Sequence, residues 1–90
     1  MDNFVFFTFR KKSSCFKLID LSYKELKSKL DIVLKELKFE GSYEIYFDYN
    51  GKEMLMFNED SFQFSLICQD IKTISIKEVN SIKIFLHKNN

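Results

Sequence analysis

The sequence contains no alanine, no proline and no tryptophan, only two glycines, and a single arginine beside thirteen lysines. Residues encoded by GC-rich codons are therefore nearly absent, whereas lysine, isoleucine, phenylalanine and asparagine are plentiful. We infer an AT-rich coding sequence, which points to a low-GC microbe or its mobile elements, or to an AT-rich eukaryote. This bias explains the preference for lysine over arginine without a functional reason.

Long apolar runs are also missing. The N-terminal run over 4–9 is short, and positive charges follow it, whereas a signal peptide places them first. No stretch approaches the roughly 20 apolar residues of a membrane span. The sequence therefore predicts no membrane association and a place in the cytoplasm, either of its own cell or of a host cell.

Few side chains offer catalytic or ligand-binding chemistry. His87 is the single histidine, so no Ser-His-Asp or Cys-His set can be assembled without it. Cys15 and Cys68 lie far apart and match no metal or CxxC spacing, and we expect two reduced thiols. Gly41 and Gly51 are isolated, whereas a phosphate-binding loop needs several glycines. The sequence predicts a protein that is not an enzyme and binds no metal and no cofactor.

The length and the charge balance narrow the class of protein. Ninety residues predict one small domain over 1–90, since chains have about 100–200 residues per domain. A hydrophobic content of 46% with 30% charged residues is typical of a globular chain. Fourteen basic residues nearly cancel 13 acidic ones, which leaves a net charge of +1. This balance argues against an acidic mimic of nucleic acid and gives no support to a strongly basic nucleic-acid binder.

The clearest predicted element is a helix over 22–39. Ser22 and Glu25 fit a capping box, in which the serine hydroxyl accepts from the Glu25 N–H and the carboxylate reaches back. Gly41 is the expected stop, because glycine adopts the left-handed conformation after a helix without strain. Ile32 and Phe39 fall opposite the apolar face, either as scattered surface residues or as a small protein-binding patch. The apolar face itself contains Tyr23, Leu26, Leu30, Val33, Leu34 and Leu37.

Strands are expected on both sides of this helix. Asn50-Gly51 is a strong hairpin signal, and 62–68 fits either a strand or a short helix. The predicted order is β-β-α-β-β-(β)-β-β, an α+β domain with one helix on a mixed or antiparallel sheet of five to seven strands. The segments with strand character are 4–10, 15–21, 43–49, 52–57, 71–78 and 81–87.

One helix is too narrow to cover such a sheet. A helix is about 10 Å wide and strands lie about 4.8 Å apart, so it shields only two to four strands. The first strand is apolar on both faces, since Val5 and Phe7 oppose Phe4 and Phe6. We therefore expect a sheet that curls into a half-barrel, or one whose far face is buried by a second copy of the chain or by another protein.

Segments 46–62 and 74–78 resemble a PB1 domain, a member of the ubiquitin-like β-grasp group. The acidic motif of that family has an aromatic residue, D-x-D-G-D, two apolar positions and D-x-D-L. The residues that match its positions here are Tyr46, Asp48, Asn50, Gly51, Lys52, Met54, Met56, Asn58 and Asp60, and Asn50 and Lys52 stand where the motif has acids. The resemblance implies a β-grasp fold and head-to-tail pairing of domains. Asp48, Glu59 and Asp60 would then meet a basic face that carries Arg10 or Lys11.

Three functions remain open at this point. The leading one is a small non-enzymatic protein that binds and inhibits or modulates another protein, as compact phage or mobile-element inhibitors of host defence do. The second is a PB1-like adaptor. The third is nucleic-acid binding by Arg10, Lys11 and Lys12, which we call the basic hairpin. The flanking Phe9 and Phe16 could stack on bases. The candidate binding residues are Arg10, Lys11, Lys12, Ile32, Phe39, Asp48, Glu59 and Asp60.

Overall fold

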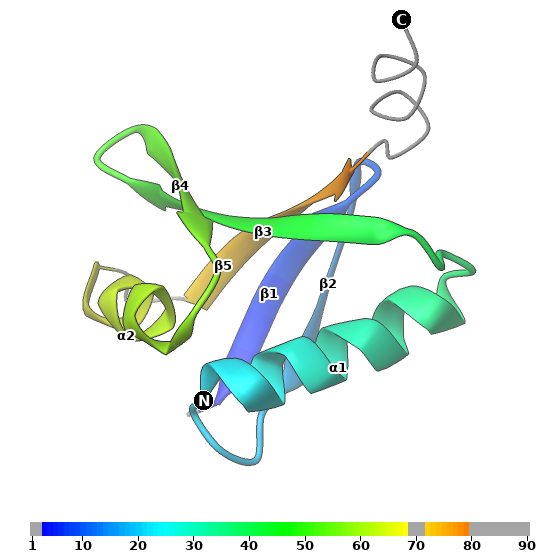
Figure 1. Ribbon diagram of the computed structural model, residues 1–90, viewed down its shortest axis with the longest axis horizontal. Helices are drawn as coiled ribbons and strands as arrows, with labels where there is room; N and C mark the ends of the chain where they lie inside the picture. The colour runs from blue at the N-terminus through cyan, green and yellow to red at the C-terminus, as the bar shows by residue number, and fades with distance from the viewer. Residues whose placement is uncertain (1–2, 69–71, 80–90) are drawn as a thin grey trace, which may run out of the picture.

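A computed structural model describes residues 3–68 and 72–79 of the chain, as two helices and a five-stranded sheet. Figure 1 shows β1 (Phe4–Phe9), β2 (Lys12–Lys17), α1 (Tyr23–Glu36), β3 (Ser42–Tyr49), β4 (Lys52–Met56), α2 (Glu59–Cys68) and β5 (Lys72–Val79). The strand order is β2-β1-β5-β3-β4. Strands β1 and β5 are parallel, and the other neighbours are antiparallel. The predicted α+β class is confirmed.

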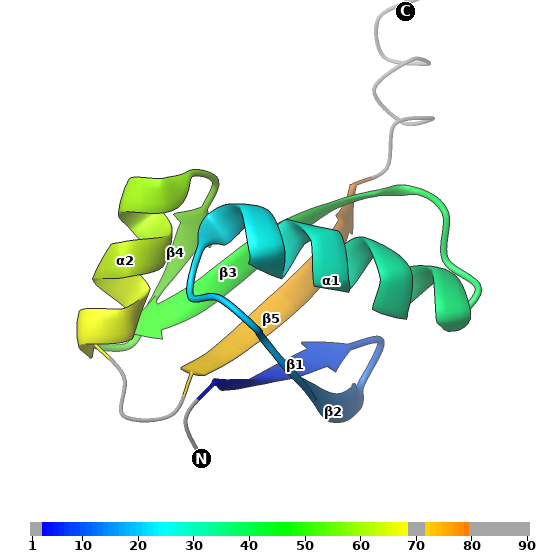
Figure 2. The ribbon, with the colours of Figure 1, turned by 90° about the horizontal axis from the view of Figure 1, so that it is seen from below.

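Both helices pack on the same face of the sheet. In Figures 1 and 2, α1 runs across that face and α2 lies beside β4. Alternation along each strand sends one set of side chains to the helices and the other set away from them. The helix α1 contributes Leu26, Leu30 and Leu34 to the core, all nearly inaccessible. The remaining core residues are Val5, Phe7, Phe9, Leu18, Ile45, Phe47, Met56, Phe62, Ile74 and Ile76.

Two tight turns set the registers of the hairpins. Asn50 and Gly51 have φ values of 51° and 82°, which confirms the predicted two-residue turn. Arg10 and Lys11 have φ values of 53° and 65°, so the first turn lies at 10–11. The prediction of a strand over 15–21 is therefore wrong, since β2 covers Lys12–Lys17. Most side chains of this edge strand are exposed, so no apolar alternation marks its start.

Helix α1 begins at the predicted serine cap, but the reciprocal half of the capping box does not form, because the Ser22 N–H donates to the Asp20 carbonyl. The Glu25 N–H donates to Ser22 Oγ at 3.2 Å, as a cap requires. The Glu25 carboxylate accepts from the backbone N–H of Ile19 at 3.3 Å. The start of the helix is therefore tied to the segment that leaves β2.

The predicted C-terminal boundary of α1 is wrong, because the helix ends at Glu36. The Phe39 N–H donates to the Leu34 carbonyl and the Lys38 N–H to the Lys35 carbonyl, both at 2.9 Å. This pattern is a Schellman motif, with Lys38 in the left-handed region at a φ of 65°. A lysine therefore ends the helix three residues before the glycine that the sequence indicated.

The early end also moves Phe39 off the solvent face of the helix. Its ring packs against the core, 5.3 Å from the ring of Phe9. Ile32 stays exposed on α1, so the predicted patch of Ile32 and Phe39 on one helical face is wrong. Gly41 serves the packing of Phe39, because a Cβ at Gly41 would lie 2.9 Å from that ring.

Segment 62–68 belongs to a second helix, so the prediction of one helix is wrong. The Ser61 N–H donates to Asn58 Oδ1 at 2.9 Å, and the Asn58 N–H donates to Ser61 Oγ at 3.1 Å. These reciprocal bonds cap the start of α2. Phe62 then enters the core. The predicted strand 81–87 and His87 lie outside the described residues.

Candidate functional site

The basic hairpin is partly engaged within the molecule. Arg10 Nε and Nη2 donate to the Glu78 carboxylate at 2.6 and 2.9 Å. The guanidinium also lies 5.0 and 5.3 Å from the ring centroids of Phe9 and Phe39. The hydrogen bonds raise the pKa of Arg10 and lower the pKa of Glu78. Arg10 thus ties the turn to β5, whereas the neighbouring Lys11 is exposed on the turn.

One of the predicted acidic residues, Glu59, holds the start of α1. Its carboxylate accepts from the backbone N–H of Tyr23 at 2.8 Å and from the side chain of Gln63 at 2.6 Å. These two hydrogen bonds lower the pKa of Glu59. The carboxylate also matches the positive end of the α1 dipole. Glu59 therefore links the two helices.

The structure does not gather the predicted acids at one point. Asp48 lies opposite Glu53 at the hairpin end of β3 and β4, and its Oδ2 accepts from the Gly51 N–H at 3.3 Å. Glu59 and Asp60 follow the other end of β4, in the first turn of α2. Asp60 is exposed. The three acids therefore flank both ends of β4.

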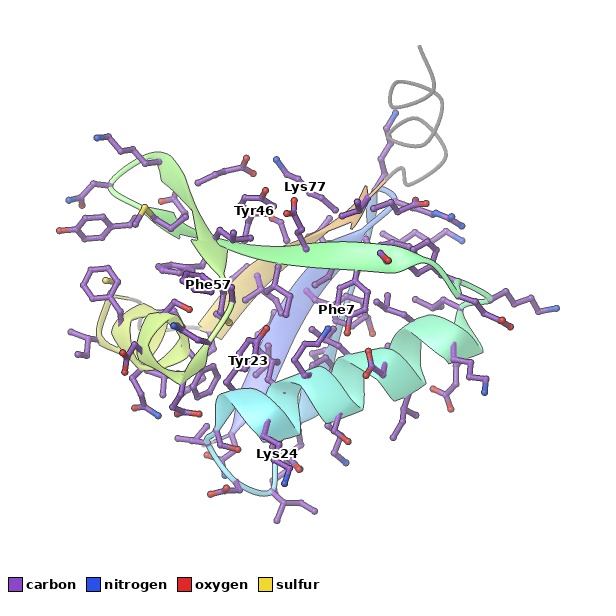
Figure 3. The ribbon with its side chains drawn as sticks, in the orientation of Figure 1. Phe7, Tyr23, Lys24, Tyr46, Phe57 and Lys77 are labelled. Atoms are coloured by element: carbon purple, nitrogen blue, oxygen red, sulfur yellow. The ribbon has the colours of Figure 1, made fainter. Side chains whose placement is uncertain are left out.

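The helices leave the opposite face of the sheet uncovered, and this face carries both apolar and charged side chains. On β1 it carries Phe4 and Phe6, which are 36% and 37% exposed. Toward β3, the Lys77 ammonium lies 4.8 Å from the Tyr46 ring centroid and pairs with Glu53. Figure 3 shows Tyr46 and Lys77 on the side of the sheet opposite α1. A continuous apolar face, as the sequence suggested for a dimer, is therefore interrupted by a charged cluster.

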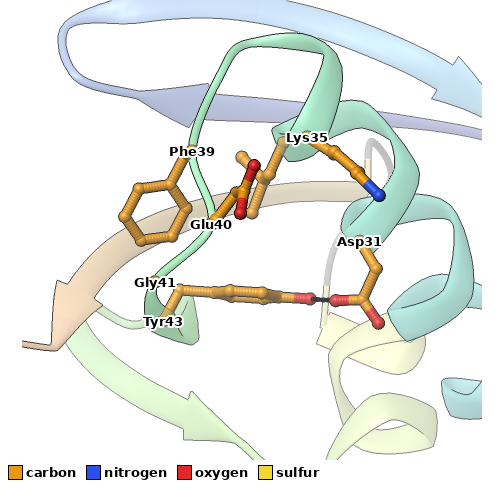
Figure 4. A pocket seen from close by; sticks show the side chains of 7 residues that line it. Asp31, Lys35, Phe39, Glu40, Gly41 and Tyr43 are labelled. Atoms are coloured by element: carbon orange, nitrogen blue, oxygen red, sulfur yellow. Dashed lines mark hydrogen bonds between the residues drawn. The ribbon is translucent and has the colours of Figure 1, made fainter.

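A hollow of about 280 Å³ lies where α1 passes into β3 (Figure 4). Tyr43 Oη donates to Asp31 Oδ1 at 2.5 Å, and the Lys27 ammonium lies 4.0 Å from the Tyr43 ring centroid. Burial and the bond to Asp31 raise the pKa of Tyr43. The volume is just under the 300–1,000 Å³ typical of ligand sites. We assign these contacts to the attachment of α1 to β3.

Exposed apolar side chains gather at the end of the molecule formed by β3, β4 and α2. Among the described residues, six of the eleven large exposed apolar side chains lie on this end: Tyr49, Met54, Leu55, Phe57, Phe64 and Ile67. A scattered exposed leucine or isoleucine is ordinary, whereas a contiguous group is informative. The concentration therefore marks this end as the candidate binding surface.

Four of these residues form one surface, which we call the hairpin–α2 patch: Tyr49, Met54, Phe64 and Ile67. The rings of Tyr49 and Phe64 meet edge to face with centroids 5.1 Å apart. Met54 pairs with Phe47, so it shares the sheet face of Tyr49 and lies diagonal to it. Ile67 follows Phe64 by three residues, which makes them neighbours on the helix.

Helix α2 explains why this patch is exposed. Its apolar residues are distributed around the whole helix, a pattern normally found in helices buried on all sides. Here only Phe62 and Ser65 are buried, whereas Ile67 is 81% exposed. No described residue covers the outer side of α2. The sequence did not reveal the patch, because 62–68 fitted a strand equally well.

Among residues 3–68 and 72–79, no three His, Cys, Asp or Glu side chains gather as a metal site would require. Cys15 is exposed and Cys68 half-buried, and neither is in a disulfide. None of the helices within the described segments is long and apolar enough to span a membrane.

Comparisons with known proteins do not assign the chain to a family. No family model matches the sequence, and neither the curated proteins nor the solved structures contain a match. The proposals for its function therefore depend on the surface just described.

Proposed function

We propose that this chain is a non-enzymatic protein-binding protein that inhibits or modulates another protein through the hairpin–α2 patch. The concentration of exposed apolar residues on β3, β4 and α2 is the observation that carries the proposal. Aromatic residues and methionine are enriched in the cores of protein interfaces. Tyr49 and Phe64 provide two rings in mutual contact, and Ile67 adds an apolar side chain that is almost fully accessible.

We also propose that the fold is a β-grasp. The strand order β2-β1-β5-β3-β4, the parallel pair β1–β5 and the helix between β2 and β3 support this assignment. The same features favour the PB1-like adaptor as a second candidate function. Because Arg10 and Glu59 are engaged in internal hydrogen bonds, such an adaptor would depend more on Lys11 and Asp60.

The setting of the function remains a proposal drawn from composition. Small size and an AT-rich coding sequence agree with a phage or mobile-element protein that acts in the cytoplasm of a host cell. A homodimer through the open sheet face would need to accommodate the cluster of Lys77, Tyr46 and Glu53. Nucleic-acid binding would have to use Lys11 and Lys12, because Arg10 is paired with Glu78.

A tagged pull-down from the native or host cell, with and without nuclease, tests the proposal. The variant Ile67→Lys places a charge in the patch, and a lysine in the last turn also suits the helix dipole. Ile32→Lys introduces the same change on the exposed side of α1 and is the matched control. We expect a stoichiometric protein partner that survives nuclease, is retained by Ile32→Lys and is lost with Ile67→Lys.

Each other outcome contradicts part of the proposal. Loss of the partner with Ile32→Lys alone would show that the binding surface lies on α1 and not on the hairpin–α2 patch. Recovery that disappears with nuclease would favour nucleic acid, and recovery of only the bait would favour self-association. Circular dichroism of both variants establishes that each is folded.

A further inference from the structure

We propose that the free edge of β2 accepts an extended acidic segment of a partner protein as a sixth strand of the sheet. The inference rests on the proposed protein-binding role, but it uses a surface separate from the hairpin–α2 patch. Strand addition supplies affinity through main-chain hydrogen bonds and specificity through alternate side chains.

The register shows which backbone groups of β2 are free. The Leu18 N–H donates to the Asn3 carbonyl at 2.8 Å, and hydrogen-bonded pairs alternate along an antiparallel ladder. The outward-facing residues are therefore Ser13, Cys15 and Lys17, whose backbone N–H and C=O groups have no partner within the described residues. All three are exposed. The other edge strand, β4, is shorter and leads directly into α2.

Two hollows and the half-buried apolar residues between them, which together we call the groove, would receive alternate side chains of the added strand. Its middle contains Phe16, which pairs with Val5 and therefore faces α1, and Val33 on the helix; both are half-buried. One end is a hollow of about 120 Å³ lined by Phe9, Arg10, Lys12 and Leu37. The other end is a hollow of about 530 Å³ lined by Asn3, Lys17, Leu18, Ile19 and Lys29.

The charges at the two ends select the occupant. Each hollow carries two basic side chains, and of these only Arg10 has an acidic partner among the described residues. Lysines at both ends of β2 disfavour a second copy of this strand, because its antiparallel partner would place lysine against lysine. Segment 80–90 contains Lys83 and Lys88 and no acid, so its charge does not suit the groove either. An acidic partner segment is therefore the complementary one.

The groove also fixes the spacing of the segment. Side chains that face α1 recur every second residue, and six residues span about 20 Å. Lys12 and Leu18, which line the two hollows and face α1, are six residues apart on β2. The geometry therefore predicts two acidic residues six positions apart, with an apolar residue between them that lies against Phe16.

Selection from a random seven-residue peptide display library tests the proposal on the full chain. We expect enrichment of peptides with acidic residues at positions 1 and 7 and an apolar residue at position 3 or 5. The double variant Lys12→Glu/Lys29→Glu should bind the selected peptide roughly tenfold more weakly or worse. Lys24→Glu/Lys52→Glu makes the same charge change away from the groove and should bind as the wild type does. Enrichment of sequences without acids, or equal loss in both double variants, would overturn the proposal.

Amide hydrogen exchange locates the bound peptide. The N–H groups of Ser13, Cys15 and Lys17 should exchange quickly in the free protein and become protected on binding, whereas those of Ser14 and Phe16 are protected in both states. Protection elsewhere, including on β4 or α2, would refute strand addition at β2. Ile67→Lys should leave peptide binding unchanged. If no peptide protects the β2 amides while partner recovery in the pull-down still depends on Ile67, the protein-binding function stands and only the strand-addition proposal is refuted.

Discussion

Substitution of Lys38 by glycine should stabilise this protein, although it removes a side chain. Lys38 is the left-handed residue of the Schellman motif that ends α1, with a φ of 65°. For a residue with a Cβ, the left-handed conformation costs about 1–2 kcal/mol of conformational free energy relative to the right-handed one, whereas glycine has no such cost. The side chain is exposed, and no described contact is lost with it.

The net gain is smaller than that strain. Glycine increases the conformational entropy of the unfolded chain, which lowers the free energy of unfolding by about 0.4–1 kcal/mol. The difference leaves a stabilisation of about 0.5–1 kcal/mol for Lys38→Gly. For a domain of this size, that corresponds to a rise in Tm of roughly 2–8 °C.

The matched control is Lys35→Gly, in the last turn of the same helix. It removes the same charge and side chain at a position with helical backbone, so it should lower stability by about 1 kcal/mol. Urea and thermal denaturation followed by circular dichroism measure both changes. If Lys38→Gly is destabilising, or if the two substitutions change stability in the same direction, the Schellman interpretation of the helix end is refuted.

Three further predictions concern the core and the two charged contacts of α1. Leu30→Ala should lower the free energy of unfolding by about 2–5 kcal/mol, because Leu30 is fully buried; denaturation in urea measures it. Since the pKa of Tyr43 is raised in the folded state, its contribution to stability is present below the unfolded value of about 10 and is lost as the pH rises. Tyr43→Phe should therefore make unfolding at alkaline pH less steep, and an unchanged pH profile would contradict this. Because the pKa of Glu59 is lowered in the folded state, its contribution to stability is present above the ordinary glutamate pKa of 4.5 and is lost on acidification. Glu59→Gln should accordingly reduce the loss of stability between about pH 5 and 3, as measured by acid titration.

Much of the fold followed from local signals in the sequence. The serine cap of α1, the Leu26–Leu34 part of its apolar face and the Asn50-Gly51 turn are each set by neighbouring residues, and all three are confirmed. Leu37, expected on the same face, lies beyond the helix end and is exposed. The α+β class could be predicted because the sequence has strand segments on both sides of one clear helix. These features could be predicted because each depends on residues that lie close together in the sequence.

The errors arose where tertiary packing overrides local preference. Lys38 adopts a conformation that favours glycine because Phe39 gains a place in the core next to Phe9. The segment 62–68 is helical because Phe62 fills the core, and its apolar residues alone do not distinguish helix from strand. Strand β2 is held by β1 and has almost no buried side chains of its own. These outcomes depend on contacts between distant parts of the chain.

The candidate site was only partly visible from the sequence. The basic turn and Glu59 were singled out as charges, but their hydrogen bonds to Glu78 and Tyr23 join elements that are distant in sequence. The hairpin–α2 patch was missed because its residues come from two strands and a helix. Only the fold brings Tyr49 and Phe64 together.

Photo-crosslinking inside the cell tests the central claim most directly. Benzoylphenylalanine would replace Ile67 in the patch, and in a parallel protein it would replace Ile32 on the exposed side of α1. We expect one discrete protein adduct from position 67 and none from position 32 after irradiation. An adduct from position 32 alone, or an adduct at 67 that nuclease removes, would contradict the proposal that the hairpin–α2 patch binds a protein.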